Sequence, residues 1–201
     1  NSNEEIVTNG TFTVDAAAQL QGKKSMMNKT GGKVMTGHEN HFGMQENNKE
    51  EVQKIDISND AKKAIETLLN DYLLLQEVLA KDDFLEAKTH INSLNDKLST
   101  VKMSLFKDKS HDLWMNYSNQ LQLELNAMIV TENIENIRMS FLNLSVTFIT
   151  LAESFEFNST NLYVIHCPMA NNDKGGDWLS KTKEVYNPYF GVKMLKCGVL
   201  K

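Results

Sequence analysis

The strongest constraint in this 201-residue sequence is a regular spacing of apolar residues between residues 57 and 157. Apolar side chains recur there at alternating steps of three and four residues, which places them on one face of an α-helix. Four separate runs show this spacing, and we therefore expect four amphipathic helices. Their apolar positions are Ala61, Ile65, Leu68, Tyr72, Leu75 and Leu79; Phe84, Ala87, Ile91, Leu94, Leu98 and Val101; Trp114, Tyr117, Leu121, Leu125 and Met128; and Ile134, Ile137, Phe141, Leu144, Phe148, Leu151 and Phe155.

The links between these expected helices indicate their order in space. The breaks near 81–83 and 130–132 are short, and the break near 104–109 is somewhat longer. Short links hold consecutive helices next to each other in opposite directions. We therefore predict an all-α fold whose centre is an antiparallel up-down four-helix bundle over residues 57–157.

Polar residues mark where each helix should begin, because a short polar side chain can bond the free N–H groups of a first turn. Ser58 precedes the first expected helix, and Asp83 with Glu86 three residues later resembles a capping box at the second. Ser110 and Thr131 are the candidate caps for the third and fourth helices.

Three further segments flank the predicted bundle, and the chain starts at Asn1 rather than Met, so we expect a piece of a longer protein. Residues 1–21 hold β-branched residues around an Asn-Gly dipeptide, which predicts two short strands or a hairpin. Residues 22–56 lack periodicity and are expected to form a linker. Residues 158–201, here called the C-terminal lobe, have strand propensity at 162–167 and a loop-rich remainder. The lobe is too small to form a core alone and should pack on the bundle.

Composition and motifs exclude several functions. The 21 basic and 26 acidic residues give a net charge of −5, which argues against nucleic-acid binding as the main task. The most apolar stretch, residues 141–157, includes Glu153 and several polar residues, so we expect no membrane span in this chain. A phosphate-binding glycine loop and a Cys-x-x-Cys-His haem attachment are both missing from the sequence. No motif points to a catalytic arrangement, and we expect the protein not to be an enzyme.

Sulfur-containing side chains concentrate in the C-terminal lobe. Cys167 and Met169 are two residues apart, and Pro168 between them favours an extended segment in which both point to one side. Met194 and Cys197 are three apart and would share a face on one helical turn. Thiolate with thioether is the ligand set that selects Cu(I), and by similar softness Ag(I). The sequence therefore offers a candidate site for transient binding of either ion.

Other interpretations of the same residues remain open at this stage. His166 is a second-rank ligand, because in a strand it would point away from Cys167. Trp178 could cover a bound cation with its indole face, or simply anchor the loop to the bundle. Cys167 and Cys197 are 30 residues apart, and they could form a disulfide, bind a metal or remain two inert thiols.

A second group of candidate ligands lies in the expected linker. A flexible His/Met tract can wrap around a metal ion, although ordering it costs affinity. The alternative is a plain linker with no role in binding. The residues are Met26, Met27, Met35, His38, His41 and Met44.

Four segments of the second half, in order, resemble a known type of domain: residues 166–172, 175–180, 187–191 and 194–198. They are similar to an uncharacterised helical domain that occurs alone or at the C-terminus of CusB-like periplasmic adaptors of copper/silver efflux pumps. The likeness covers about residues 57–201. The Cys-Pro-Met core also resembles small heavy-metal-binding modules of copper transport proteins.

The N-terminal part is consistent with this resemblance. Residues 6–20 resemble the last strands of the membrane-proximal domain of such adaptors, and residues 25–28 with the Gly37-His38 tract resemble its junction to the helical domain. The likeness implies a periplasmic domain that captures Cu(I) or Ag(I) and passes it to an inner-membrane efflux pump. That pump works with an outer-membrane channel and other adaptor copies. The rival expectation is a structural or docking module with a Cys167–Cys197 disulfide and no metal role.

Overall fold

The computed structural model describes residues 54–156 and 162–201. The described residues belong to one compact unit, Glu51–Lys201. The expected N-terminal strands lie outside the described residues, and so does nearly all of the linker.

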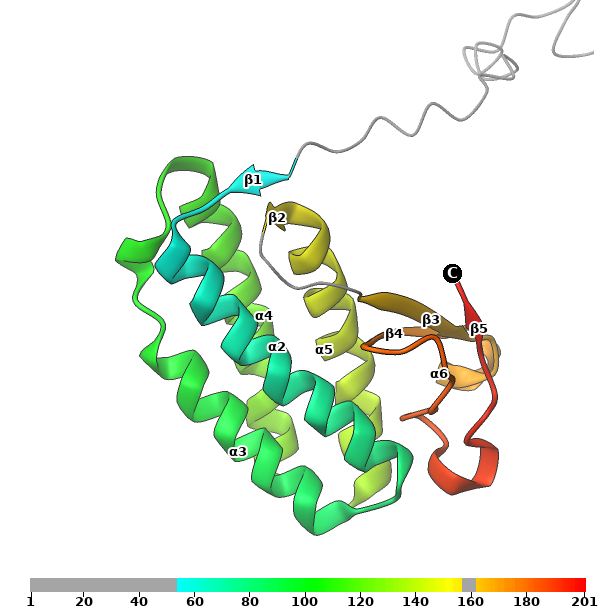
Figure 1. The fold of residues 1–201 in the computed structure, drawn as a ribbon. Helices are drawn as coiled ribbons and strands as arrows, with labels where there is room; N and C mark the ends of the chain where they lie inside the picture. Colours follow the sequence, from blue (N-terminus) through cyan, green and yellow to red (C-terminus); the bar gives the residue numbers. More distant parts are fainter. Residues whose placement is uncertain (1–53, 157–161) are drawn as a thin grey trace, which may run out of the picture. The chain divides into compact units, whose positions relative to one another are not determined.

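Four long helices form most of the described structure: α2 (Asn59–Ala80), α3 (Phe84–Thr100), α4 (Asp108–Val130) and α5 (Ile134–Ser154). Figure 1 shows them side by side, and each packs against the next in sequence, with α5 also contacting α2. We call these four helices the bundle. The prediction of a mainly helical chain with short strands is confirmed.

The apolar stripes of the sequence form the core of the bundle. All of the predicted stripe positions are buried except Phe84, Val101 and Ile134, which lie at helix ends and are partly buried. Tyr72 lies near the centre, stacked on Phe141 with ring centroids 5.2 Å apart and 4.5 Å from the ring of Phe148. Such aromatic pairs add about 0.5–1.5 kcal/mol each beyond simple burial.

Two of the predicted helix caps are confirmed. The Ser58 hydroxyl accepts a hydrogen bond from the Ala61 N–H at 3.2 Å, and α2 begins at the following residue. The Asp83 carboxylate accepts one from the Glu86 N–H at 3.0 Å at the start of α3. Each bond satisfies a first-turn donor that has no partner within the helix.

The other two predicted caps are wrong by two or three residues. α4 begins earlier, with Lys107 before it, and Ser110 lies inside its first turn, where its hydroxyl accepts from the Lys107 N–H at 2.9 Å. α5 begins later, because Asn133 provides the cap by accepting from the Glu135 N–H at 2.7 Å. Thr131 instead accepts from the Asn133 N–H at 3.4 Å.

The C-terminal lobe contains a three-stranded antiparallel sheet with strand order β4-β3-β5. Its strands are β3 (Tyr163–Cys167), β4 (Gly176–Ser180) and β5 (Val199–Leu200). The turn between β3 and β4 holds the short helical segment α6 (Ala170–Asp173), and a 3₁₀ turn, η3 (Gly191–Met194), precedes β5. β3 falls where strand propensity predicted it, whereas β4 lies in the part expected to be loop.

A second, very short pairing joins the two ends of the bundle. β1 (Ile55–Asp56) runs parallel to β2 (Phe155–Glu156), which follows α5 directly. The 3₁₀ turn η2 (Met103–Leu105) lies in the longer break between α3 and α4. No helix in the part of the chain that the structure describes is long and apolar enough to cross a membrane.

The lobe packs on the bundle through β4. The Leu179 N–H donates to the Tyr72 hydroxyl at 3.1 Å, and that hydroxyl also lies 2.8 Å from the Ser145 hydroxyl. Gly176 leaves no space for a side chain, because a Cβ there would lie 2.6 Å from Cδ1 of Leu142. The sheet therefore approaches α5 closely, and one buried tyrosine joins α2, α5 and β4.

Candidate metal centre

The two cysteines of the chain lie together in the lobe. Cys167 is the last residue of β3, and Cys197 lies in the turn between η3 and β5. Their Sγ atoms are 3.7 Å apart and both residues are free thiols. Cys167 is fully buried, whereas Cys197 is partly exposed.

Strand pairing brings the two thiols together. β5 pairs with β3 so that Val199 lies opposite His166, and the next position in this register places Gly198 opposite Cys167. The Lys201 N–H extends the pairing by donating to the Val164 carbonyl at 2.9 Å. Cys197, directly before Gly198, therefore reaches the end of β3.

Asn187 holds the segment that carries Cys197. This fully buried side chain donates from Nδ2 to the Cys197 carbonyl at 2.7 Å. Its Oδ1 accepts from the N–H groups of Tyr189 at 2.8 Å and Phe190 at 3.2 Å, and its own N–H donates to the Leu195 carbonyl at 2.9 Å. This role of Asn187 was not predicted. The signal in the sequence was the Asn-Pro dipeptide, because Asn bonds the backbone two residues on in turns.

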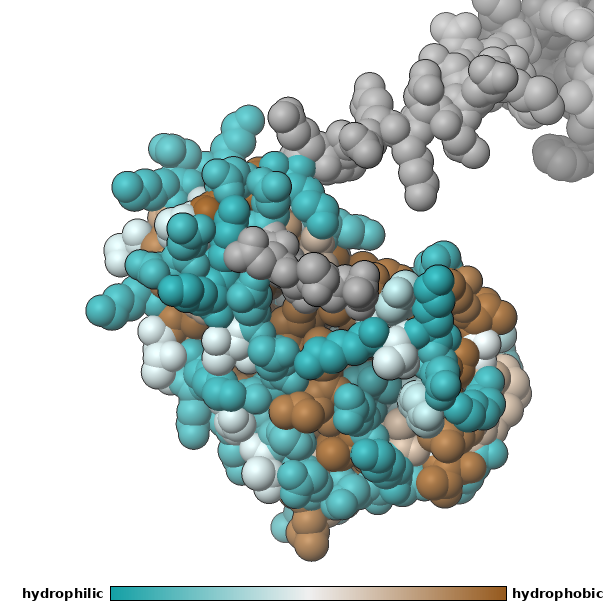
Figure 2. Space-filling view, viewed as in Figure 1, coloured by the Kyte–Doolittle hydropathy of each residue, from teal (hydrophilic) through white to brown (hydrophobic). Residues whose placement is uncertain are grey.

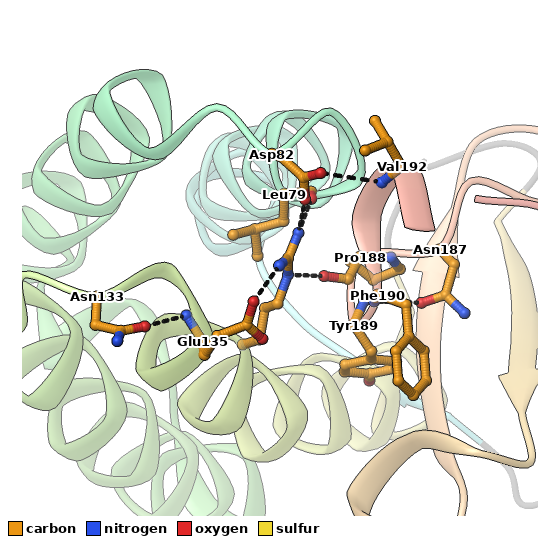
Figure 3. Close-up of polar contacts among 10 residues, drawn as sticks. Leu79, Asp82, Asn133, Glu135, Asn187, Pro188, Tyr189, Phe190 and Val192 are labelled. Atoms are coloured by element: carbon orange, nitrogen blue, oxygen red, sulfur yellow. Dashed lines mark hydrogen bonds and ion pairs between the residues drawn. The ribbon is translucent and has the colours of Figure 1, made fainter. Parts of the chain in front are cut away.

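Arg138 fixes the same segment to the bundle. Its partners Leu79, Asp82, Glu135 and Pro188 are labelled in Figure 3. This buried guanidinium donates from Nε to the Pro188 carbonyl at 3.0 Å and from Nη2 to the Leu79 carbonyl at 2.8 Å. It also pairs with the carboxylates of Asp82 and Glu135. Sequence reasoning missed Arg138, since its partners lie 50 or more residues away apart from Glu135.

Asp82 completes this contact from the link between α2 and α3. Its Oδ2 accepts from the Val192 N–H at 3.2 Å. Burial alone would raise the pKa of Asp82, but hydrogen bonds from Arg138 and Val192 and the charges of Arg138 and Lys193 hold it below its ordinary value. Gly191 has φ +58°, and a Cβ there would collide with the Asp82 carboxylate and the Arg138 guanidinium, so the position requires glycine.

The two predicted methionine ligands have different surroundings. Met194 and Cys197 belong to one turn, because the Cys197 N–H donates to the Met194 carbonyl at 2.9 Å. The 3₁₀ turn η3 ends at Met194, so Cys197 itself lies beyond the helical residues. The predicted extended segment at Met169 is wrong. Met169 has helical angles (φ −88°, ψ −11°) in the turn after β3, and it is 44% exposed while Cys167 is buried.

His166 lies apart from the thiol pair, as strand alternation predicted. Its Nδ1 is 2.6 Å from Oδ1 of Asp177, whose Oδ2 accepts from the Lys201 ammonium at 2.7 Å. Burial would raise the pKa of Asp177, but hydrogen bonds from Lys201 and His166, together with their charges, hold it below its usual value. The His166 ring also covers Gly175, where a Cβ would lie 2.6 Å from Cε1.

Trp178 is fully buried in the lobe, next to the thiol-bearing turn. A Cβ on Gly198 would lie 3.0 Å from Cη2 of its indole, and Tyr189 packs edge-on with ring centroids 5.7 Å apart. Among the described residues its Nε1 has no hydrogen-bond partner. The contacts given for its ring lie within the lobe, with Tyr189 and Gly198, so the anchoring role and the metal-covering role both stay predictions.

The protonation of Cys197 affects what the pair can bind. Burial and the neighbouring Cys167 thiol raise the pKa of Cys197 above that of an ordinary thiol. At neutral pH this thiol keeps its proton, and a metal ion bound there would have to displace it. Within residues 54–156 and 162–201, no group of three or more His, Cys, Asp or Glu is arranged to hold a metal ion.

The candidate ligands of the linker lie outside the described residues, so the structure does not test them. They are Met26, Met27, Met35, His38, His41 and Met44.

Comparison with known protein families gives a match over part of the chain. Residues 68–160 match the model described as "Protein of unknown function (DUF3347)". This region runs from within α2 to just beyond α5, so it covers most of the bundle and stops before the thiol pair. No curated protein matches the chain. No solved structure matches it either.

Proposed function

We propose that the C-terminal lobe binds Cu(I) or Ag(I) transiently, with the thiolates of Cys167 and Cys197 as its principal ligands. The observation that supports this most directly is the 3.7 Å separation of two free thiols from distant parts of the chain. Thiolates bind soft cations in preference to hard ones. A partly exposed Cys197 gives an ion a way to reach the buried Cys167.

Thioether ligands complete the proposed site. Met194 shares a turn with Cys197 and is the better placed of the two methionines. Met169 follows Cys167 by two residues but is half-exposed in a turn, so we assign it to the capture of an incoming ion. His166 is the weakest candidate, because its Nδ1 already pairs with Asp177.

The proposed role in the cell follows from the resemblance to CusB-like adaptors. We propose that the protein is a periplasmic part of an efflux adaptor, and that it passes the ion by ligand exchange to an inner-membrane pump. An outer-membrane channel and other adaptor copies would be its further partners. In this proposal the bundle has the antiparallel up-down order that its short links favour, and it serves as the support for the lobe.

An anaerobic Cu(I) titration of the reduced full chain against a chromogenic Cu(I) chelator tests the proposal. We expect one ion per chain, and we expect that binding to be lost in the Cys167→Ser/Cys197→Ser variant. Met194→Leu should weaken binding with little effect on stability, because the substitution roughly conserves volume. Unchanged binding in the double serine variant would refute the thiol site.

The alternative is a docking module in which the cysteines form a fixed disulfide. Exposed apolar side chains on the lobe favour it: Val192 is 63% exposed, Val199 60% and Leu200 46%. Figure 2 shows brown, hydrophobic surface on the side of the lobe that carries β5. Two titratable thiols in protein purified without reductant would contradict the fixed disulfide.

A further inference from the structure

We propose that Cys197 is a modification site for small-molecule disulfides, and that Cys167 resolves the resulting adduct into a reversible Cys167–Cys197 bridge. The bridge would switch the thiol pair off as a metal site. The thiol–disulfide exchange is inferred from the geometry of the lobe alone. Its regulatory meaning rests on the proposed function, which it extends.

The distance between the thiols suits such a pair. The Sγ atoms are 3.7 Å apart, and a disulfide bond is about 2.05 Å long, so closure requires an approach of about 1.7 Å. Cys197 lies in a turn between η3 and β5, outside any regular element. In this proposal, rotation of the Cys197 side chain with a small shift of its turn closes the remaining gap between the sulfurs.

Access differs between the two thiols and gives the reaction an order. Cys167 is fully buried, at the end of a strand that pairs on both sides. Cys197 is partly exposed. Because thiol–disulfide exchange requires direct attack by one sulfur on another, a reagent larger than water reaches Cys197 first.

The chemistry proceeds in two balanced steps. The Cys197 thiolate attacks one sulfur of a disulfide RS–SR, forming Cys197–S–SR and releasing RS⁻, which takes up the proton lost from Cys197. The Cys167 thiolate then attacks Sγ of Cys197, forming the bridge and releasing the second RS⁻, which takes up the proton from Cys167. The two protein thiols together lose two electrons, and the small disulfide gains them and is reduced to two thiols.

Bridge formation removes the ligands of the proposed metal site. The thiolate is the form of cysteine that binds a metal, and a disulfide has no thiolate to offer. The oxidised lobe would therefore bind Cu(I) only through its remaining thioethers. Reduction by a small dithiol restores both ligands, so the state of the pair follows the thiol–disulfide balance of its surroundings.

Hydroxyethyl disulfide and intact-mass spectrometry test the order of the steps. The wild type should lose two hydrogens and show the mixed adduct only transiently. Cys167→Ser should accumulate one stable adduct on Cys197. Cys197→Ser should react more slowly than Cys167→Ser by at least about tenfold, because its remaining thiol is buried.

Urea provides the control for folding. In unfolding concentrations of urea the two single variants should react at similar rates, because the difference comes from burial and not from the thiols themselves. Equal rates for the two folded variants would overturn the assigned order. A wild-type protein that stops at the mixed adduct would overturn the resolving role of Cys167. A bridge that a dithiol does not reopen would overturn the reversibility of the switch.

A Cu(I) titration of the oxidised and reduced wild type separates this inference from the proposed function. Binding that is tight when reduced and weakened about a hundredfold or more when oxidised supports the switch. Equal binding in both states overturns it. A reduced protein that binds no Cu(I) refutes the proposed function and the switch, while the exchange reaction is still decided by mass spectrometry.

Discussion

Single polar side chains hold the thiol pair in place. Asn187 is fully buried and bonds the carbonyl of Cys197 and two backbone N–H groups of its own turn. A buried amide is stable only when its polar groups are paired, so each of these bonds restricts where the turn can lie. The position of Cys197 beside Cys167 therefore depends on a residue that bonds the backbone of this segment.

Asn187→Ala should destabilise the protein by roughly 2–4 kcal/mol, because it leaves one buried and two part-buried backbone groups without their side-chain partner. Urea denaturation of reduced protein measures the effect. Asn119→Ala, at an exposed position of α4, is the matched control and should change stability by less than about 0.5 kcal/mol. Equal midpoints for the two variants would contradict the role assigned to Asn187.

At the scale of elements, the contact between bundle and lobe depends on a few groups from distant segments. Tyr72 of α2 bonds Ser145 of α5 and the backbone of Leu179 in β4. Burial, opposed in part by these two hydrogen bonds, raises the pKa of Tyr72 to far above its ordinary value. The hydroxyl is thus neutral at any working pH, and it serves as a hydrogen-bonding group between three elements.

Tyr72→Phe should cost about 1–3 kcal/mol, because the ring still fills its place while the Leu179 N–H and the Ser145 hydroxyl lose their partner. Thermal unfolding followed by circular dichroism gives the comparison. Tyr163→Phe removes the hydroxyl of a half-buried tyrosine in β3 and should have little effect. A loss of the same size in both variants would show that the cost is not specific to this junction.

Asp82 makes the contact between the α2–α3 link and η3 sensitive to acid. The folded-state pKa is lowered, so the carboxylate stabilises the fold above its unfolded pKa of about 3.9. This contribution is lost as the pH falls through the folded value. Asp82→Asn should therefore be less stable than the wild type at pH 7, and the gap should narrow below about pH 4.

Denaturant midpoints measured from pH 7 down to pH 2 test this dependence. Asp96→Asn, at an exposed position of α3, is the control and should follow the wild type throughout. A constant gap between Asp82→Asn and wild type across the range would mean that the carboxylate charge does not stabilise the contact.

The sequence allowed the helices to be predicted but not the junction. The spacing of apolar residues is a local signal. It predicted α2 to α5 because a helix that buries one face needs apolar residues at three- and four-residue steps. β4 was missed because Gly176 and Asp177 are unfavourable in strands, and the strand forms through its pairing with β3. The cysteines could be proposed as ligands from the sequence because thiolates bind soft cations. Arg138 was missed because its hydrogen bonds reach Leu79 and Pro188, which are distant in the sequence.

At the scale of the molecule, the bundle provides the buried surface that the lobe needs to be stable. A sheet with a two-residue edge strand and one short helical segment buries too little to be stable alone. β4 lies on α5, and the thiol-bearing segment is bonded to Arg138 and Asp82. These contacts with the bundle therefore support the segment that carries Cys197, and binding at the thiols should in turn stabilise the whole described unit.

Ag(I) tests this coupling and the contribution of the linker in the full chain. An ion that binds only the folded state stabilises it by about 2.7 kcal/mol at a hundredfold excess over the dissociation constant. We expect this rise in unfolding free energy for reduced wild type and none for Cys167→Ser/Cys197→Ser. The triple variant His38→Ala/His41→Ala/Met44→Leu should keep the full rise, because the thiol pair provides the site. A rise lost in the triple variant would show that linker residues complete the site, and a rise kept in the double serine variant would move the site away from the thiols altogether.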